Sequence, residues 1–410
     1  MMQCRHCGGS VFTPFLDLEL APPSNSYLEA EALSRPEKRY PLVIRTCTAC
    51  WLTQTEDFAD REEFFSGDYA YFSSFSRTWL DHAKAYVAEM RDRFGLTETS
   101  LVAEIAANDG YLLQYVQALG IPCYGVEPTH GTAEAARARG IDIVEDFFGV
   151  DLAERLAGEG RQADLIAANN VLAHVPDIND FVAGFARLLK PAGVATFEFP
   201  HVLEMVRGNQ FDTAYHEHYS YLSLLAVERI FAENGLTVFD VGTTPHHGGS
   251  LRVYACRADH QAHAVTPAVA SMLETERQAG LDGEAFYAGF QASAEAARDA
   301  FREFLAEART SGLKVAAYGA AAKGNTLLNF AGATARDIAF VVDRNPAKQG
   351  RYMPGSQIPI VGEDRLLSEQ PDRVVILPWN IETEIRTQLS YIRDWDGQFV
   401  TAIPMLAIRT

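Results

Sequence analysis

Between residues 75 and 256, short apolar segments of strand character alternate with segments of helical character. Such alternation is typical of βαβ units, in which parallel strands form one sheet covered by helices. The last two predicted strands are joined by a short loop, which allows only an antiparallel hairpin. We therefore expect an α/β fold with a doubly wound, largely parallel sheet that includes one antiparallel strand. The predicted strands are Leu101–Ala106, Cys123–Glu127, Ile141–Val144, Ala163–Ala168, Val194–Phe199, Leu236–Val241 and Ser250–Cys256.

The residues on either side of this sheet predict two further units. Residues 264–311 are helical in pattern, with an apolar stripe that is typical of a helix packed between domains. Strand-like segments then recur from residue 314 onward, which predicts a second, Rossmann-like α/β unit. For 410 residues at roughly 150 per domain, we expect domains at 1–72, 73–260 and 261–410. The stripe consists of Phe286, Phe290, Ala294, Ala297, Phe301 and Leu305.

Four of the 6 cysteines stand in two Cys-x-x-Cys pairs near the N-terminus. The turn in such a pair brings both sulfurs to one side, and four thiolates presented from two turns suit tetrahedral zinc. We therefore expect a closed structural zinc site in the first domain, with a redox dithiol as the alternative. The long insert between the pairs must form its own hairpin or loop. The predicted ligands are Cys4, Cys7, Cys47 and Cys50.

The charge of the chain excludes several classes of partner. Lys and Arg number 35 and Asp and Glu 54, which gives a net charge of −19. Because binding of nucleic acid or of an anionic membrane needs surplus basic charge, we expect neither partner. The sequence shows no apolar run of about 18 residues and no apolar leader at its start, so we expect a cytoplasmic protein. The net charge favours a soluble monomer.

The turn after the first predicted strand is a candidate cofactor site. Ala106 and Asn108 stand where a dinucleotide-binding turn would have glycines, and the turn has no basic residue. Acidic residues at 104, 109 and 127 suit a positively charged cofactor without phosphate, such as S-adenosylmethionine. A sheet-edge turn with incidental acids is the alternative. The candidate contacts are Glu104, Ala106, Asn108, Gly110, Tyr111, Glu127, Pro128, Asp146, Phe147, Phe148, Asn169, Asn170 and His174.

The densest group of proton-transfer side chains lies in residues 211–221, shortly after the fifth strand. Ligands of open α/β sheets bind beyond the carboxyl ends of the strands, so this segment should lie over the cofactor turn. Its mixed side chains favour acid–base chemistry, with a zinc or iron site on the His-x-His motif as the alternative. The residues are Tyr215, His216, Glu217, His218 and Tyr219.

A second aromatic cluster occupies residues 68–76, just before the predicted cofactor domain. It could form a lid that supplies a tyrosine hydroxyl to the site. A hydrophobic bridge between the first two domains explains the same composition equally well.

A second nucleotide site is predicted in the last domain. Residues 319–324 follow a strand, and amides at a helix N-terminus together with Lys323 would attract an anion. The order of glycine and lysine does not match an ATPase P-loop. Residues 343–350 carry acids and bases that could hold a ribose and phosphates, and a purely structural unit is the alternative. The candidate substrate contacts are Lys323, Asn325, Asp343, Asn345, Trp379 and Asn380.

Several motifs occur in order along the chain: the cysteine pairs and residues 108–113, 215–222, 247–252 and 343–346. With these motifs the chain resembles the S-adenosylmethionine-dependent sugar 3-C-methyltransferases of deoxysugar biosynthesis over essentially its whole length. The resemblance implies a class I methyltransferase sheet between a small four-cysteine zinc domain and a C-terminal Rossmann-like domain. Ala106 departs from the family, which usually has glycine there, and its methyl group should narrow the turn slightly.

The resemblance also implies a substrate similar to a nucleotide-linked 4-keto-6-deoxysugar, bound between the middle and C-terminal domains. His218 matches the family's general base, which removes the C3 proton before the C3 carbanion attacks the methyl group. Tyr215 and Glu217 match residues that orient the sugar and stabilise the enediolate. Either Tyr69 or Tyr71 matches a further hydroxyl near the sugar.

Two functions from other classes compete with this one. A nicotinamide-dependent oxidoreductase would use the C-terminal unit, with Gly319, Gly324 and Asp343 as its support. A zinc-containing adaptor would depend on its cysteines and bind no small molecule. Saturable binding of NADH would favour the first, and the lack of any ligand that raises the melting temperature would favour the second.

Overall fold

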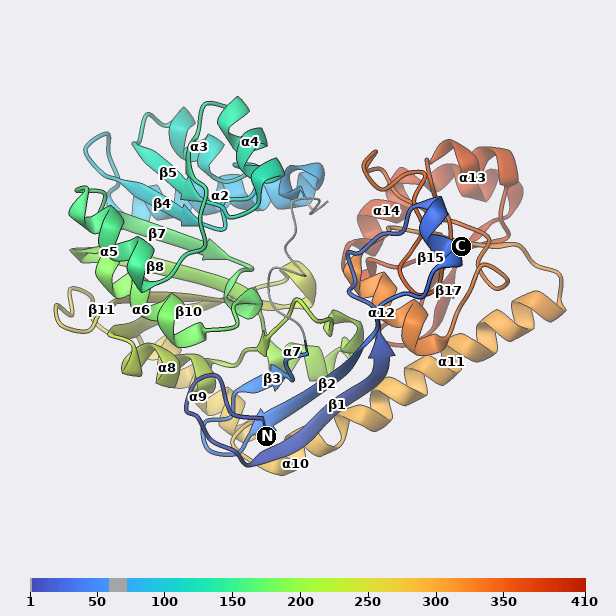
Figure 1. The fold of residues 1–410 in the computed structure, drawn as a ribbon, viewed down its shortest axis with the longest axis horizontal. Helices are drawn as coiled ribbons and strands as arrows, with labels where there is room; N and C mark the ends of the chain where they lie inside the picture. Colours follow the sequence, from blue (N-terminus) through green and yellow to red (C-terminus); the bar gives the residue numbers. More distant parts are fainter. Residues whose placement is uncertain (1, 59–71) are drawn as a thin grey trace.

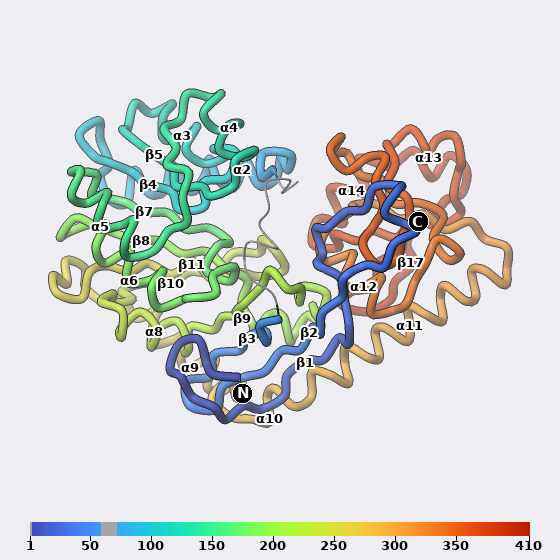
Figure 2. The backbone as a smooth tube through the Cα atoms, in the orientation of Figure 1, coloured from blue at the N-terminus to red at the C-terminus, as the bar shows by residue number. Residues whose placement is uncertain are grey.

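The computed structural model describes residues 2–58 and 72–410. Two α/β lobes lie side by side in Figure 1, and the N-terminal strands and the long helix α11 (Phe290–Thr310) run along their lower side. Figure 2 shows the same path, with the chain entering the second lobe after α11. Among the described residues, no helix combines the length and apolarity needed to cross a membrane.

The first lobe contains a seven-stranded sheet. Its strands are β4 (Val102–Ile105), β5 (Cys123–Val126), β6 (Asp142–Val144), β7 (Ala163–Asn169), β8 (Leu189–Pro200), β10 (Leu236–Thr244) and β11 (Ser250–Arg257). Their order is β10-β11-β8-β7-β4-β5-β6, with β4 to β8 parallel. β11 runs antiparallel to both β8 and β10. The predicted α/β sheet with one antiparallel strand is therefore confirmed.

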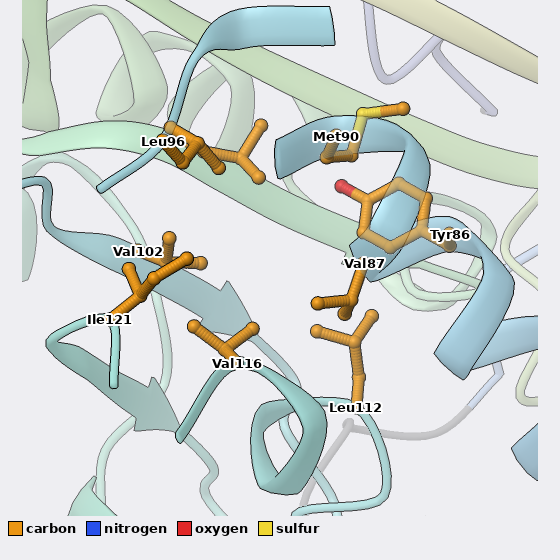
Figure 3. Close-up of a pocket in the computed structure, with 9 residues that line it drawn as sticks. Tyr86, Val87, Met90, Leu96, Val102, Leu112, Val116 and Ile121 are labelled. Atoms are coloured by element: carbon orange, nitrogen blue, oxygen red, sulfur yellow. The ribbon is translucent and has the colours of Figure 1, made fainter. Parts of the chain in front are cut away.

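Helices cover both faces of this sheet. They are α2 (Arg77–Phe94), α3 (Leu113–Ala118), α4 (His130–Ala138), α5 (Val150–Gly158), α6 (Ile178–Leu188), α7 (Val202–Arg207) and α8 (Leu224–Glu233), with the short 3-10 helices η2 (Ser73–Phe75), η3 (Leu172–His174), η4 (Phe211–Thr213) and η5 (His246–Gly248). Figure 3 shows Tyr86, Met90 and neighbouring apolar side chains around a void of about 10 Å³ between α2 and the sheet. Since its walls are almost wholly apolar, this void is a packing gap and not a ligand site.

The N-terminal segment forms three strands of a separate four-stranded sheet, and the fourth strand comes from residues 220–221. In order they are β1 (Phe12–Ala21), β2 (Tyr40–Cys47), β3 (Thr53–Thr55) and β9 (Ser220–Tyr221). The insert between the cysteine pairs forms the antiparallel β1–β2 hairpin. Its connecting loop contains η1 (Ala30–Ser34) and reaches the second lobe, where Leu28 forms a β-bridge with Tyr352.

The second lobe contains a six-stranded sheet in the order β14-β13-β12-β15-β16-β17, parallel except for β17. The strands are β12 (Val315–Tyr318), β13 (Val341–Val342), β14 (Ile360–Val361), β15 (Arg373–Ile376), β16 (Gln398–Thr401) and β17 (Ala407–Arg409). The helices from residue 267 onward, besides α11, are α9 (Pro267–Ala279), α10 (Glu284–Ala288), α12 (Ala322–Ala331), α13 (Asp364–Glu369) and α14 (Glu382–Gln388), with η6 (Trp379–Ile381) and η7 (Ser390–Trp395).

Helix α11 bridges the N-terminal sheet and the second lobe. From Phe290 onward every residue of its predicted apolar stripe is buried, whereas Phe286 lies in α10 and is partly exposed. Phe290 stacks on Phe15 of β1, with ring centroids 4.8 Å apart. The stripe therefore packs as predicted for a helix between domains.

Gly319 and Gly312 offer a matched test of packing in the second lobe. Both have positive φ, 90° and 70°, so alanine at either should cost roughly 1–2 kcal/mol. A Cβ at Gly319 would also lie 2.5 Å from Pro378 Cδ, whereas at Gly312 it would meet nothing within 4 Å. We expect Gly319→Ala to lower the melting temperature clearly more than Gly312→Ala. Equal losses would contradict this close packing.

Candidate active site

The four cysteine side chains converge. Their sulfur atoms all lie within 4.8 Å of one another, and all but Cys7 are buried. Four thiolates leave no open position, so the cluster fits structural zinc, which would tie the chain before β1 to the end of β2. No other set of three or more His, Cys, Asp or Glu side chains in the described part of the chain has such spacing.

The segment rich in proton-transfer groups is held between the N-terminal sheet and the first lobe. Its strand β9 pairs antiparallel with β3. Thr55, at the end of β3, donates from its backbone N–H to the Tyr219 carbonyl (3.1 Å) and from its hydroxyl to the His218 carbonyl (2.5 Å). The zinc-binding unit therefore fixes the backbone at the centre of this segment.

His218 is held as a neutral imidazole with one defined tautomer. Its Nδ1 lies 2.8 Å from the Thr213 carbonyl, which can only accept, so Nδ1 carries the proton and Nε2 has the lone pair. Burial and the neighbouring His174 hold the pKa of His218 well below its usual value. A neutral imidazole of this kind can act as a base.

His174 connects His218 to the end of the central sheet. It ends η3, just after β7, and its ring centroid lies 4.5 Å from that of His218. Its Nδ1 donates to the Glu217 carbonyl (2.8 Å), and burial lowers its pKa to about 4. His174, a predicted cofactor contact, and His218, the predicted base, are thus neighbours.

Tyr215 and Glu217 flank His218 in the same segment. The Tyr215 ring lies 3.9 Å from the His218 ring, centroid to centroid. Glu217 is only 1% exposed, and its Oε1 accepts from Asn25 Nδ2 at 3.1 Å. Burial raises the pKa of Glu217 to about 7, so its carboxyl is partly protonated at neutral pH.

The two other members of the segment point elsewhere. His216 donates from Nε2 to the Pro41 carbonyl (3.2 Å), and Tyr219 lies under the Arg5 guanidinium. Because His216 and His218 bond to carbonyls of different units, their geometry does not support the His-x-His metal site. Tyr69 and Tyr71 lie outside the described residues.

The candidate cofactor turn is stabilised by Glu127. The backbone N–H groups of Asn108 and Thr129 each donate to one Glu127 oxygen at 2.9 Å. The side chains of Thr129 and Thr132 also bond to this carboxylate. An acidic group at this place in the sheet suits a ribose hydroxyl. Ala106 has φ 60°, a conformation that favours glycine, and so carries a strain that glycine would not.

Buried acceptors near the ends of β4 and β7 fit a cationic ligand. The Oδ1 atoms of Asn169 and Asn170 are buried and have no hydrogen-bond partner within the described structure. Glu104 is fully buried beside Tyr111, and burial raises its pKa well above the usual value. The two asparagine oxygens suit the ammonium group of S-adenosylmethionine.

The remaining predicted cofactor contacts differ in accessibility. Phe148 is buried against Phe181 and Phe185 of α6, which makes it a core residue, whereas Phe147 is partly exposed. Asp146 is exposed and paired with Arg155. Gly110 is buried and Pro128 is partly exposed at the same end of the sheet. Of the two phenylalanines, Phe147 is the one that could stack on an adenine.

The second lobe brings a buried lysine to the same region. Lys323 Nζ lies 4.7 Å from the Trp379 ring centroid and has no hydrogen-bond partner among the described residues. Trp379 Nε1 donates to Asp212 Oδ2 (2.8 Å) in η4. Burial raises the pKa of Asp212 to about 6 and lowers the pKa of Lys323. This cluster joins the C-terminal lobe to the segment that carries His218.

The glycines of residues 319–324 serve packing. A Cβ at Gly324 would lie 2.7 Å from Leu377 Cβ, and Gly319 packs on Pro378. The Asp343 carboxylate accepts from the backbone N–H groups of Ala320 and Asn345, both at 2.8 Å. Since packing and turn formation account for these residues, they no longer support a nicotinamide-binding site.

The last two predicted substrate contacts lie in different settings. Asn325 is buried in α12 and accepts from Asn329 Nδ2 through its backbone carbonyl (2.9 Å) and Oδ1 (3.2 Å). Asn380 is partly exposed in η6. Asn380 is therefore the more accessible of the two.

Sequence reasoning missed residues that the fold brings to this region. Asn25 and Tyr27 come from the insert between the cysteine pairs, where no periodicity marks them. His247 lies in the β10–β11 loop with φ 55°, and burial lowers its pKa to about 3. Asp212 lies in the segment 211–221 and His247 in the motif 247–252. Both stretches were identified from the sequence, so they are the signal that could have found these two residues.

Replacement of Glu217 by glutamine should change how stability depends on pH. The folded-state pKa of about 7 lies above the usual 4.5, so the folded protein loses stability as the pH rises through 7, by on the order of 3 kcal/mol. Glutamine cannot ionise. We expect the melting temperature of Glu217→Gln, relative to the unmodified protein, to rise between about pH 5 and about pH 8. For the exposed control Glu29→Gln, we expect a difference in melting temperature that does not change with pH. The same result for Glu217→Gln would contradict a raised pKa of Glu217 in the folded protein.

Loss of the zinc ligands should loosen the β3–β9 pairing. We expect about one zinc per chain, and Cys47→Ser to lose most of it, measured by elemental analysis. Hydrogen exchange at residues 53–55 and 220–221 should then become faster, because β2 holds β3 in place. The matched control is Cys123→Ser, which lies outside the cluster and should keep the metal. Full zinc retention in Cys47→Ser would exclude this ligand set.

Three family models match successive parts of the chain. A zinc binding domain matches residues 4–65, a methyltransferase domain matches residues 79–241, and a C-methyltransferase C-terminal domain matches residues 245–404. Together they span nearly the whole sequence in the order that the cysteine pairs and the two lobes follow.

Relatives of known activity agree with these models. The chain is 34% identical to the C-methyltransferase NovU of Streptomyces niveus over 402 residues, 98% of this chain and 95% of NovU. It is 27% identical to the ubiquinone biosynthesis O-methyltransferase of Bartonella quintana over 36% of this chain and 64% of that protein. Among solved structures, the magnesium protoporphyrin IX methyltransferase of Synechocystis with bound S-adenosylmethionine aligns over 43% of this chain and 79% of its own, at 16% identity and a TM-score of 0.34. The chain therefore belongs to the C-methyltransferases: it is an S-adenosylmethionine-dependent enzyme with an N-terminal zinc-binding domain.

Proposed function

We propose that this C-methyltransferase methylates C3 of a nucleotide-linked 4-keto-6-deoxysugar, with His218 as the base. The sugar and the position of methylation come from the resemblance in motif order along the chain. The base comes from the geometry: His218 is buried, neutral and fixed with its Nε2 lone pair available. This last observation carries the proposal, because removal of a proton next to a ketone needs a base whose lone pair is free at neutral pH.

The proposed reaction begins when His218 Nε2 takes the C3 proton, which the neighbouring ketone makes acidic. S-Adenosylmethionine, when bound, supplies an electrophilic methyl group on a sulfonium. The electron pair left on the sugar forms the new C3–methyl bond, while the electrons of the sulfur–methyl bond stay on sulfur. His218 then returns its proton to solvent. Tyr215 and Glu217 would orient the sugar and stabilise the charge on its C4 oxygen.

Lys323 is the proposed contact for the nucleotide diphosphate. Its ammonium group is buried, lies near Asp212 and Trp379, and lacks a hydrogen-bond partner in the described residues. A diphosphate would supply acceptors for all three of its protons and remove the cost of a buried unpaired charge. The sugar would then extend from this lysine toward His218, whose pKa Lys323 also lowers.

Replacement of His218 tests the proposal. We expect His218→Ala to lose about 10²- to 10⁴-fold in methyl transfer to thymidine-, guanosine- or cytidine-diphosphate-linked 4-keto-6-deoxysugars. It should still bind the cofactor, seen as a rise in melting temperature with S-adenosylhomocysteine. The product, analysed by NMR, should carry the new methyl group on C3.

His216 gives a matched control, because it is an adjacent histidine directed toward Pro41. His216→Asn should lose less than about tenfold in turnover. Full activity of His218→Ala would remove His218 as the base. Failure of the unmodified enzyme on every keto-sugar, despite cofactor binding, would remove the proposed substrate.

A further inference from the structure

The loop that follows β1, at the far end of the hairpin between the cysteine pairs, contributes a polar side chain to the active segment. Asn25 lies in this loop, and its Nδ2 donates to Glu217 Oε1 at 3.1 Å. The two residues are 192 positions apart in the chain. Asn25 can contact Glu217 because the hairpin extends from the zinc unit past the segment that carries His218.

The two carboxyl oxygens of Glu217 differ in their hydrogen bonds. Oε1 is occupied by Asn25, whereas Oε2 is buried and has no hydrogen-bond partner among the described residues. An amide N–H bonds to a carboxyl oxygen that does not carry the proton, so a proton on Glu217 would sit on Oε2. A buried group of this kind gains most from a partner that arrives with the substrate.

The titratable side chains around Glu217 do not favour its charged form. They come from three elements: Tyr27 from the insert, Tyr221 from β9, and His174 from η3, which bonds the Glu217 carbonyl. Burial raises the pKa of both tyrosines and lowers that of His174, so none of the three is charged near neutral pH. The backbone N–H groups of Glu217 and Asn25 do favour the carboxylate, and the Asn25 side chain bonds to it as well.

Asn25 is itself held from the second lobe. Tyr27, two residues on, donates its hydroxyl to the Ala320 carbonyl at 2.6 Å, and Lys348 Nζ donates to the same carbonyl at 2.7 Å. The Tyr27 hydroxyl also lies 3.4 Å from Asn25 Oδ1. The loop is therefore fixed between the turn that follows β12 and the active segment, with little freedom for Asn25 to turn away.

We propose that Asn25 is a positioning residue for methyl transfer: it fixes the Glu217 carboxyl so that Oε2 carries the proton and donates a hydrogen bond to the sugar oxygen that gains negative charge. This role rests on the proposed function, because it requires an enediolate intermediate. No proton leaves Glu217, since the bond only strengthens as charge develops on the sugar oxygen.

An infrared titration tests the contact without any substrate. The band of the protonated Glu217 carboxyl is the one that disappears in Glu217→Gln, and its intensity against pH gives the midpoint of Glu217. The Asn25 bond favours the charged carboxylate. We therefore expect a higher midpoint in Asn25→Ala, and a still higher one in Asn25→Asp, which adds a second carboxylate. The exposed neighbour Ser26→Ala should leave the midpoint unchanged.

Kinetics test the positioning role. We expect Asn25→Ala to lower kcat about tenfold with little change in KM, because the lost bond acts at the transition state. The decline of kcat at high pH, where Glu217 loses its proton, should move upward with the infrared midpoint. Glu217→Gln should keep part of the activity without this decline, since its amide can accept from Asn25 and still donate.

Two results would overturn the proposal: an unchanged midpoint in Asn25→Ala, or a shifted midpoint with unchanged kcat and pH profile. Asn25→Ser repeats the test if Asn25→Ala fails to fold, judged by its zinc content and melting temperature. If the unmodified enzyme methylates no keto-sugar, the proposed function is wrong, and so is the role of Asn25 in methyl transfer. The infrared titration still decides whether Asn25 sets the state of Glu217.

Discussion

The pairing of β3 with β9 is the interaction on which the arrangement of the active segment depends. β9 has only two residues, and alone it could not fix the backbone between His216 and Tyr221. Thr55 adds two hydrogen bonds to the same stretch, and β3 is in turn held by β2, which ends at a zinc ligand. The metal site would therefore act at a distance, because it would hold the sheet edge against which the segment with His218 lies.

Burial determines which groups at this junction are charged. It lowers the pKa of His174, His218 and His247 and raises that of Asp212 and Glu217, so that the histidines are neutral and the carboxyls partly protonated near pH 7. Each of these groups costs folding free energy that a solvated group would not. Under the proposed function, a neutral His218 beside a partly protonated Glu217 suits a reaction in which charge develops on a substrate oxygen and is then removed.

Much of the fold could be predicted from the sequence because it depends on local pattern. The alternation of strands and helices predicted the seven-stranded sheet, the short Gly/His loop predicted its antiparallel strand, and the cysteine pairs predicted the metal cluster. The pairing of β9 with β3 could not be predicted, since a two-residue strand has no periodicity and its partner is far away in the chain. The domain limits at 72 and 260 and the roles of individual site residues remain predictions.

The direction of individual side chains could not be predicted from the sequence either. His216 and His218 look equivalent in sequence, yet one bonds the Pro41 carbonyl of β2 and the other the Thr213 carbonyl of η4. Phe147 and Phe148 are likewise adjacent, but α6 covers only the second. The elements that pack on each side determine the direction of each side chain. That direction decides which members of a polar cluster can contact a ligand.

The β1–β2 hairpin explains why the zinc unit and the second lobe belong to one active enzyme. Its base is set by the cysteine cluster, and its connecting loop bonds the turn after β12 through Tyr27. Asn25 lies between these two anchors, so its contact with Glu217 depends on both. The Glu217 side chain thus contacts a loop held by the two outer units, whereas its backbone carbonyl is bonded by His174 of the middle one. Methyl transfer would then require all three units to be assembled, although the cofactor needs only one of them.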